Sequence, residues 1–313
     1  MPPTTTSGAT SNPASPSGVL ATLSMFLGAS RFHIVIISFL ATMTFSWLFS
    51  GIFGPLVALV VAIDWWILDV GNKISDLAED LRNNPTEARW VSANERGLSI
   101  AAVGAFLVTL ALTPLLGWLL VGLRVVFQLL GVFYNFRSIP WFGGRRTRFK
   151  DLYAVKNPAA GVLFLLSVIG YPLAAFGSQI QVSWAYIGLL ALFFLLFENS
   201  FEVIYDLKDI PGDRAEGIPT FPAVHGDRVG LFVVAGLASA AAIVIVIGYL
   251  TRVFGFRELL IVMAPLLQLA IVPIFRRRGY RAHDTVWITH LGSAQLAIYL
   301  TYAWLELPIP PWS

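Results

Sequence analysis

The sequence predicts an all-α, polytopic membrane protein, and three observations support this fold class. Of the 313 residues, 57% are hydrophobic and 12% are charged, whereas a soluble domain carries about 25% charged residues. Nine apolar stretches have roughly the 20 residues that a helix needs to cross a bilayer. The basic residues gather in alternate connections between these stretches, as they do in membrane proteins.

The apolar stretches give the expected elements in chain order. Residues 1–18 have no charge and little apolar surface, which predicts a disordered tail. Residues 19–29 are expected to form an interfacial helix, at the start of a single transmembrane domain that covers residues 19–313. The predicted transmembrane helices are residues 32–50, 51–70, 98–117, 118–135, 158–177, 183–201, 229–250, 257–275 and 285–305.

Short and long connections alternate along the chain, and the charges follow them. All lysines and arginines except Arg124, Arg252 and Arg257 precede the first span or lie in the long connections. The positive-inside rule therefore predicts that the long loops are cytoplasmic, and we expect a bacterial cytoplasmic membrane. This topology accounts for the net charge of +3 without a nucleic acid as partner.

Acidic residues recur with helical spacing after the sixth span. Asp206, Asp209 and Asp213 are three and four residues apart, so a helix would direct all three carboxylates to one side. Such a row repels itself unless a cation lies on it. The alternative is a solvated helix end that forms salt bridges with the basic loops.

A second row follows the second span. Asn72, Asp76 and Asp80 lie at intervals of four residues. Asp76 and Asp80 align with Asp209 and Asp213 at an offset of 133 residues, which suggests a parallel internal repeat. Both rows are expected at the cytoplasmic ends of their helices.

Two converging acidic rows suit a hard divalent cation. Magnesium in particular is held by a few carboxylates together with the phosphates of a substrate. Lys150 and Lys156, in the loop before the fifth span, would add ammonium groups to the same anion, although plain topology could also explain them. The apolar helices suit a lipid tail, so an allylic diphosphate fits. The chain has no cysteine, which excludes thiolate sites.

Four segments carry a resemblance to a known family. NKISDLAED (residues 72–80) is similar to the first Asp-rich motif of the UbiA superfamily of intramembrane prenyltransferases. YDLKDIPGDRAEGIPTFPAVHG (residues 205–226) resembles the second motif, and FKDLYAVKNP (residues 149–158) the basic segment before the fifth helix. Residues 30–33 resemble the start of the first helix. The similarity covers about residues 23–305 and implies nine helices around a central cavity, with a cytoplasmic active site.

The resemblance implies roles for these residues. It assigns two Mg²⁺ ions and the diphosphate to Asn72, Asp76, Asp80, Asp206, Asp209 and Asp213, with catalytic roles for the last two acids of each row, and it adds Lys208 to Lys150 and Lys156 as a diphosphate ligand. The implied reaction transfers a prenyl group from an isoprenyl diphosphate to a lipophilic acceptor, aromatic or quinone-type, within the membrane. Lys73 departs from the family pattern, which often has Asp there.

Further polar and aromatic residues are candidates for the cavity wall. Intramembrane acids are functional candidates because they are costly to bury; they are Asp64, Asp69, Glu198 and Glu202. For Asp64 the alternative is a structural pair with Arg124. Aromatic rings could shield an allylic cation; the candidates are Trp65, Tyr134, Trp141, Tyr153 and Tyr205.

Two other functions remain open at this point. The same architecture could close the prenyl cation on itself, which would make the protein a UbiA-type terpene cyclase. A cation-coupled transporter would also need intramembrane acids. However, the acids here gather at one end of the helices, and no inverted repeat is visible.

Overall fold

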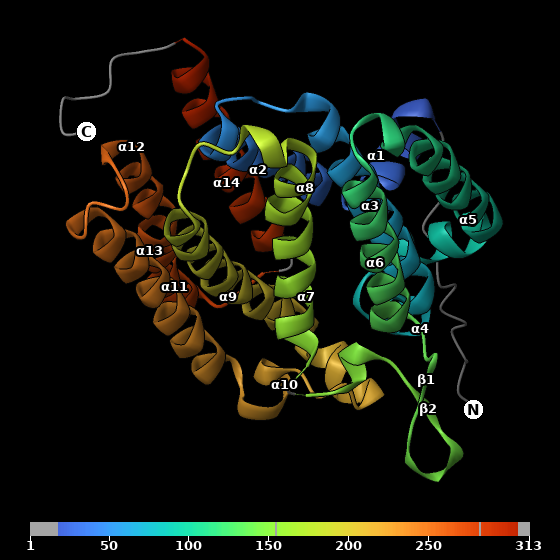
Figure 1. Ribbon diagram of the computed structural model, residues 1–313. Helices are drawn as coiled ribbons and strands as arrows, with labels where there is room; N and C mark the ends of the chain where they lie inside the picture. The colour runs from blue at the N-terminus through green and yellow to red at the C-terminus, as the bar shows by residue number, and fades with distance from the viewer. Residues whose placement is uncertain (1–17, 154, 282, 306–313) are drawn as a thin grey trace, which may run out of the picture.

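The computed structural model describes residues 18–153, 155–281 and 283–305 (Figure 1). The predicted disordered tail, apart from Gly18, lies outside the described residues. Within them the regular secondary structure is helical except for two short antiparallel strands, β1 (Ile139–Pro140) and β2 (Arg146–Thr147), in which Ile139 pairs with Thr147. These strands form a hairpin that extends below the bundle in Figure 1.

Each predicted span overlaps a long helix, although α5 begins 13 residues before its predicted span and α9 ends 15 residues after its own. They are α2 (Phe32–Ser50), α3 (Pro55–Ser75), α5 (Pro85–Leu112), α6 (Trp118–Asn135), α7 (Lys156–Leu165) continued by α8 (Tyr171–Phe176), α9 (Trp184–Glu216), α11 (Asp227–Leu250), α13 (Met263–Arg278) and α14 (Asp284–Trp304). The shorter helices are α1 (Val19–Ala29), α4 (Leu77–Asn83), α10 (Phe221–His225) and α12 (Phe256–Leu259).

Eight helical segments of the described chain are long and apolar enough to cross a membrane. The ninth predicted span corresponds to α14, which has 21 residues but is more polar than the others. Its buried residues include Asp284, Thr285, Thr289 and Ser293. The protein is therefore an integral membrane protein.

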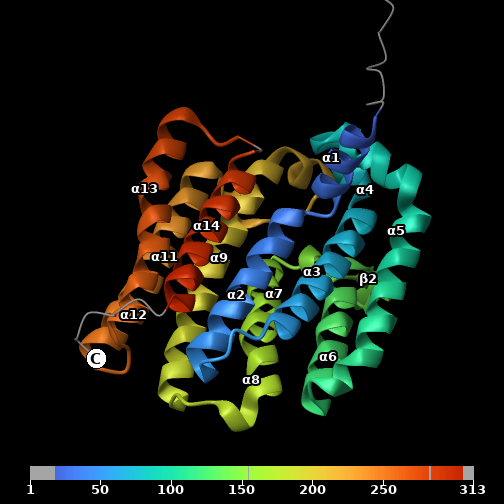
Figure 2. The same cartoon turned by 90° about the horizontal axis from the view of Figure 1, so that it is seen from above.

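The helices pack side by side around one interior. In spatial order the neighbours are α13, α11, α9, α7, α6, α3, α2 and α14, with α5 outside α3. Figure 2 shows α13 at one edge of the bundle and α5 at the other. The largest cluster of buried apolar side chains draws on α2, α3, α6, α7 and α9. The short helices α4 and α10 lie at the same end as the hairpin (Figure 1).

The span that begins with α7 contains a π-helical turn, Leu166–Gly170, two residues before Pro172. Such turns are rare and frequently occur at functional sites. Here the turn contains Ser167, whose hydroxyl accepts a hydrogen bond of 2.9 Å from the Trp65 indole of α3. Trp65 also stacks on Phe164, with ring centroids 3.6 Å apart. This contact fixes an aromatic wall on the interior.

Candidate active site

The first acidic row lies where α3 ends and α4 begins. Asn72 is in the last turns of α3, Asp76 is at the junction, and Asp80 is in α4. The backbone at Asp76 leaves the helical region (φ −105°, ψ 15°), so the row bends, which its four-residue spacing did not predict. The hydrogen bonds Asp76 N–Asn72 O (3.0 Å) and Asp80 N–Asp76 O (2.9 Å) preserve the helical spacing across the bend.

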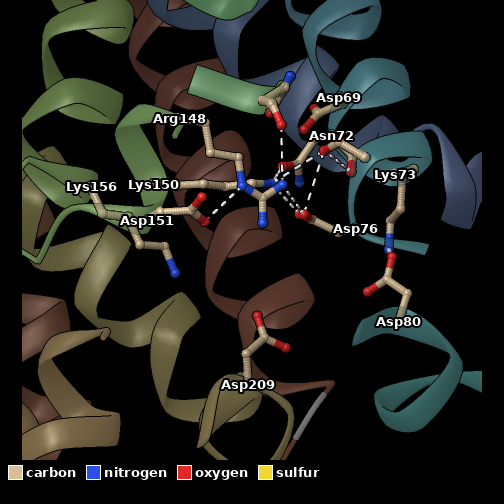
Figure 3. A network of polar contacts seen from close by, with 12 residues as sticks. Asp69, Asn72, Lys73, Asp76, Asp80, Arg148, Lys150, Asp151, Lys156 and Asp209 are labelled. Atoms are coloured by element: carbon tan, nitrogen blue, oxygen red, sulfur yellow. Dashed lines mark hydrogen bonds and ion pairs between the residues drawn. The ribbon is translucent and has the colours of Figure 1, made fainter. Parts of the chain in front are cut away.

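Two basic residues of the loop before α7 converge on Asp76 (Figure 3). Lys150 is buried; its Nζ contacts the Asp76 carboxylate and donates to Asn72 Oδ1 at 2.7 Å. Arg148 Nη1 donates to Asp76 Oδ1 at 2.9 Å. Burial alone would raise the pKa of Asp76, but Lys150 and Arg148 outweigh it and lower that pKa. Burial lowers the pKa of Lys150 to about 8, although Asp76 opposes the shift.

Lys73, the residue that departs from the family pattern, neutralises the end of this row. Its Nζ lies 2.9 Å from Asp80 Oδ2 and 2.8 Å from Glu87 Oε1. In Figure 3 this pair stands apart from the cluster around Asp76. Lys73 therefore ties α3 to α4 and to the start of α5.

The second acidic row lies on the extension of α9, as its spacing predicted. Asp206 Oδ1 accepts a hydrogen bond of 2.7 Å from Lys156 Nζ, and its other oxygen accepts one of 3.0 Å from the Asn157 amide. Asp209 pairs with Lys208 at 2.8 Å. Asp213 accepts a hydrogen bond of 2.6 Å from the Thr220 hydroxyl.

The sequence after this row ends α9 and holds its last acid. Gly217 is the C-cap of α9 with a left-handed backbone (φ 68°), a conformation that glycine adopts without steric cost. The chain then reaches Thr220, whose hydroxyl accepts from Ala223 N as the N-cap of α10. The Thr-x-Pro segment thus both starts α10 and fixes Asp213.

A glycine lets the two rows approach each other. A Cβ atom at Gly212 of α9 would overlap the side chain of Asn83 at the end of α4. Because no side chain is present at residue 212, α4 packs directly on α9. This contact brings the helix that carries Asp80 against the helix that carries Asp209.

Both rows open on one cavity of about 230 Å³. Its wall combines polar residues from the rows with apolar residues from α2, α3, α7, α9 and α13. The predicted residues that line it are Asp69, Asn72, Asp76, Asp80, Tyr134, Lys150, Lys156, Glu198, Glu202, Tyr205, Asp206 and Asp209. Asp213 and Lys208 are not among the described residues that line it; Asp213 bonds to Thr220, and Lys208 pairs with Asp209.

The structure places Asp64 away from the cavity, so its interpretation as a cavity residue was wrong. Asp64 and Arg124 are both fully buried. The Asp64 oxygens accept hydrogen bonds from Arg124 (2.6 and 2.9 Å), Gln128 (3.0 Å) and Tyr171 (3.0 Å). Asp64 therefore belongs to a structural pair that joins α3, α6 and α8, which is the alternative that the sequence allowed.

Two of the aromatic candidates also lie elsewhere. Trp141 and Tyr153 are exposed, and the Tyr153 hydroxyl bonds to His225 at 2.7 Å. Trp65, Tyr134 and Tyr205 do line the cavity. Tyr205 is oriented by Thr289, whose hydroxyl lies 2.8 Å from its own.

The residues at the cavity mouth suit magnesium together with a substrate. Among the described residues, no three acidic or histidine side chains are close enough to enclose a metal ion by themselves. Magnesium commonly takes only one or two carboxylates and completes its shell with water and phosphate oxygens. Carboxylates are close together at this mouth: burial, followed by the carboxylates of Asp76, Asp213 and Asp209, raises the pKa of Glu79 to about 8. These donors fit Mg²⁺ once a diphosphate shares the site.

Several polar residues of the site were missed in the sequence, among them Arg31, Glu79, Arg148, Asn157 and Gln268. Arg148 lies two residues before Lys150, and its contact with Asp76 depends on the turn Phe149–Asp151. Asn157 directly follows Lys156, so the segment before α7 could have indicated it. Gln268 of α13 lines the cavity, but a single polar residue in an apolar stretch gave no signal of its position.

Comparison with known proteins agrees with this geometry. The UbiA prenyltransferase family matches residues 69–289. The digeranylgeranylglyceryl phosphate synthase of Natronomonas pharaonis is 30% identical over 208 residues, 64% of this chain and 68% of the relative. The synthase of the same name from Methanobrevibacter smithii is 23% identical over 284 residues, 86% of this chain and 93% of the relative.

Solved structures show the same fold. A UbiA homologue from Archaeoglobus fulgidus bound to GPP and Mg²⁺ superposes with a TM-score of 0.69 at 13% identity, over 89% of this chain and 99% of that chain. The same homologue bound to DMAPP and Mg²⁺ gives a TM-score of 0.65 at 13% identity, over 91% of this chain and all (100%) of the other. The family match spans well over half of the sequence and includes both acidic rows. The chain therefore belongs to the UbiA prenyltransferase family and is an intramembrane prenyltransferase.

Proposed function

We propose that this prenyltransferase moves a geranylgeranyl group from geranylgeranyl diphosphate to a hydroxyl group of a prenylated glyceryl phosphate. The observation that carries the proposal is the cavity that joins two acidic rows, the buried Lys150 and the partly buried Lys156 to an apolar interior. Such a cavity accepts a charged head at its mouth and an isoprenoid tail among the helices.

The aromatic or quinone-type acceptor expected from the sequence finds no support in the comparisons. The relatives described above are both named for a glyceryl phosphate product. One further cation favours a phosphate-bearing acceptor. Arg31 lines the cavity, and its only ion pair within the described residues is a 3.5 Å contact with Asp69. Its remaining N–H groups suit an acceptor phosphate.

The same relatives come from archaea, so the bacterial membrane expected from the sequence has no support either. The cytoplasmic position of the cavity mouth stays a prediction from the charge distribution.

In this proposal the two rows hold Mg²⁺ and the diphosphate. Asn72, Asp76 and Asp80 would bind on one side, and Asp206 with Asp209 on the other. Bound magnesium would neutralise the negative charge that develops on the departing diphosphate. Asp213 does not line the cavity; it would contribute its negative charge to the row that contains Asp209.

Two lysines and two aromatic residues of the cavity would bind the diphosphate and shield the allylic cation. Lys150 and Lys156 place ammonium groups at the mouth, where they would meet phosphate oxygens. The stacked pair Trp65 and Phe164 excludes water from the interior and presents ring faces to an allylic cation. The acceptor oxygen would then bond to carbon one of the prenyl group.

The test uses the purified protein in nanodiscs with geranylgeranyl diphosphate and geranylgeranylglyceryl phosphate, with magnesium or with EDTA. We expect pyrophosphate release that needs both magnesium and acceptor, and a product whose mass equals the acceptor plus one geranylgeranyl group minus the hydroxyl hydrogen that it replaces. A hydrocarbon formed without acceptor would instead identify a cyclase. Transfer to a quinone precursor but not to the glyceryl phosphate would overturn the acceptor assignment.

A further inference from the structure

Two carboxylic acids lie on the cavity wall below the acidic rows. Glu198 and Glu202 of α9 line the cavity together with the aromatic residues Phe193, Phe194, Phe197 and Phe201. Within the part of the chain that the structure describes, neither side chain forms a hydrogen bond or an ion pair. An acid within the membrane is costly and usually has a function. The proposed binding of Mg²⁺ and diphosphate uses neither.

A second observation indicates that a polar group binds at this level. The Nε2 atom of Gln268 on α13 is buried and has no hydrogen-bond partner among the described residues, although the residue lines the same cavity and is only 3% exposed. Its Oε1 atom accepts a hydrogen bond of 2.9 Å from Ser200, which fixes the amide. An unpaired buried donor is destabilising by about 1–3 kcal/mol, so a ligand acceptor atom would compensate it.

The position of Glu202 follows from the helix. Glu202 precedes Asp206 by four residues on α9, so both side chains point to the same side, about 6 Å apart along the axis. If the diphosphate binds at Asp206 and Asp209, as the proposed function requires, carbon one of the prenyl group lies about one turn of α9 deeper in the cavity. Glu202 lies at the same depth. Glu198 lies one turn deeper.

We propose that Glu202 is the proton acceptor of the transfer, and that Glu198 and Gln268 bind the remaining polar atoms of a hydroxyl-bearing acceptor. The bond from carbon one to the diphosphate oxygen breaks, and its electron pair leaves with pyrophosphate. The acceptor hydroxyl oxygen bonds to carbon one, and its proton moves to the Glu202 carboxylate. Glu202 releases that proton to water after the product leaves.

This arrangement also selects the acceptor. The Glu202 carboxylate would repel a carboxylate or phosphate, so an acidic group of the acceptor would not occupy this level of the cavity. The acceptor hydroxyl would lie beside Glu202, and the phosphate would stay at the mouth near Arg31. The inference rests on the proposed function. It narrows the acceptors to those whose reactive hydroxyl and anionic group can bind at different levels of the cavity.

The test compares Glu202→Gln with Glu95→Gln, an exposed glutamate of α5, in the nanodisc assay above. General-base catalysis contributes roughly 10²–10⁴-fold. Glu202→Gln should therefore lower ether formation at least about 100-fold, while magnesium-dependent binding of geranylgeranyl diphosphate stays within about threefold of wild type. Glu95→Gln should match wild type. Ether formation by Glu202→Gln within about threefold of wild type would overturn the proposal.

An acceptor with a thiol in place of the hydroxyl distinguishes a role of Glu202 in proton transfer from a role in maintaining the shape of the site. A thiol ionises far more readily than an alcohol and needs less help from a base. With an acceptor whose reactive hydroxyl is replaced by a thiol, Glu202→Gln should lose much less activity than with the hydroxyl compound. Equal losses would show a structural role and reject the proton acceptor. Should Glu202→Gln fail to fold, Glu202→Asp is compared with the same two acceptors, and the same inequality is expected.

The activity of the wild-type protein tests the proposed acceptor separately from the proposed role of Glu202. If wild type transfers the prenyl group to a quinone precursor rather than to the glyceryl phosphate, the proposed acceptor is wrong, and Glu202 is then tested with that acceptor and its thiol analogue. If wild type forms ether and Glu202→Gln does so equally well, only the proton acceptor is wrong.

Discussion

At the scale of single residues, the two acidic rows have different environments, and this predicts different effects of mutation. Within the described part of the chain, the ion pair of Asp209 is with the neighbouring Lys208, whose side chain is 21% exposed. Asp76 balances Lys150 and Arg148, which are both buried. Asp209→Asn should therefore lower turnover at least about 100-fold without changing the melting temperature. Asp76→Asn should lower both, because it leaves two buried cations poorly paired.

Thermal unfolding in detergent and pyrophosphate release measure the two effects. Ser178→Ala, in an exposed connection, serves as the control for both. Normal stability of Asp76→Asn would contradict the role of the Asp76 carboxylate as the counter-ion of Lys150 and Arg148. Near-normal turnover of Asp209→Asn would remove Asp209 from the site.

The sequence could reveal the acids of the site but not the residues that pair with them. Asn72, Asp76 and Asp80 share one row because local spacing alone decides which side of a helix they face. The pair Asp64–Arg124 bridges 60 positions, and Arg148 reaches Asp76 across 72. Such contacts depend on how helices pack, and no local pattern encodes that packing. The sequence therefore predicted the acids well and their partners poorly.

At the scale of helices, the close contact of α4 with α9 keeps the two rows together. Gly212→Ala should push Asn83 and α4 away, because the added methyl group overlaps the Asn83 side chain. We expect turnover to fall roughly tenfold or more, since small displacements of catalytic groups are that costly. Gly97→Ala in α5, where a Cβ meets nothing within 4 Å, is the matched control.

Steady-state kinetics with both variants measures this effect. Gly212→Ala combined with Asn83→Ala should recover part of the lost turnover, because the smaller side chain makes room for the methyl group. An unchanged turnover in Gly212→Ala would mean that the α4–α9 contact does not position the rows.

Helix positions were largely predictable because membrane spans are set by apolar length. The bend at Asp76 and the extension of α9 to Glu216 lie beyond the apolar stretches, where length no longer decides. The bend appears in the structure as a change of backbone angle at Asp76, and the regular spacing of Asn72, Asp76 and Asp80 gave no sign of it.

At the scale of the whole molecule, the charge distribution predicts which end of the bundle faces the cytoplasm. The absence of cysteine allows a direct measurement with single cysteine substitutions. Arg145→Cys lies in the exposed hairpin near the cavity mouth, and Ser178→Cys lies in a short connection of the opposite set. Both positions are exposed, so a maleimide reagent can reach either one once it is on the correct side.

In intact cells a membrane-impermeant maleimide should label Ser178→Cys and not Arg145→Cys, and permeabilisation should expose Arg145→Cys. The positive-inside rule gives this direction because the arginine-rich loops resist translocation. The reverse labelling pattern would place the cavity mouth outside. Isoprenyl diphosphates carry several negative charges and do not cross a bilayer unaided, so the side on which Arg145→Cys is labelled also fixes the compartment that must supply the donor.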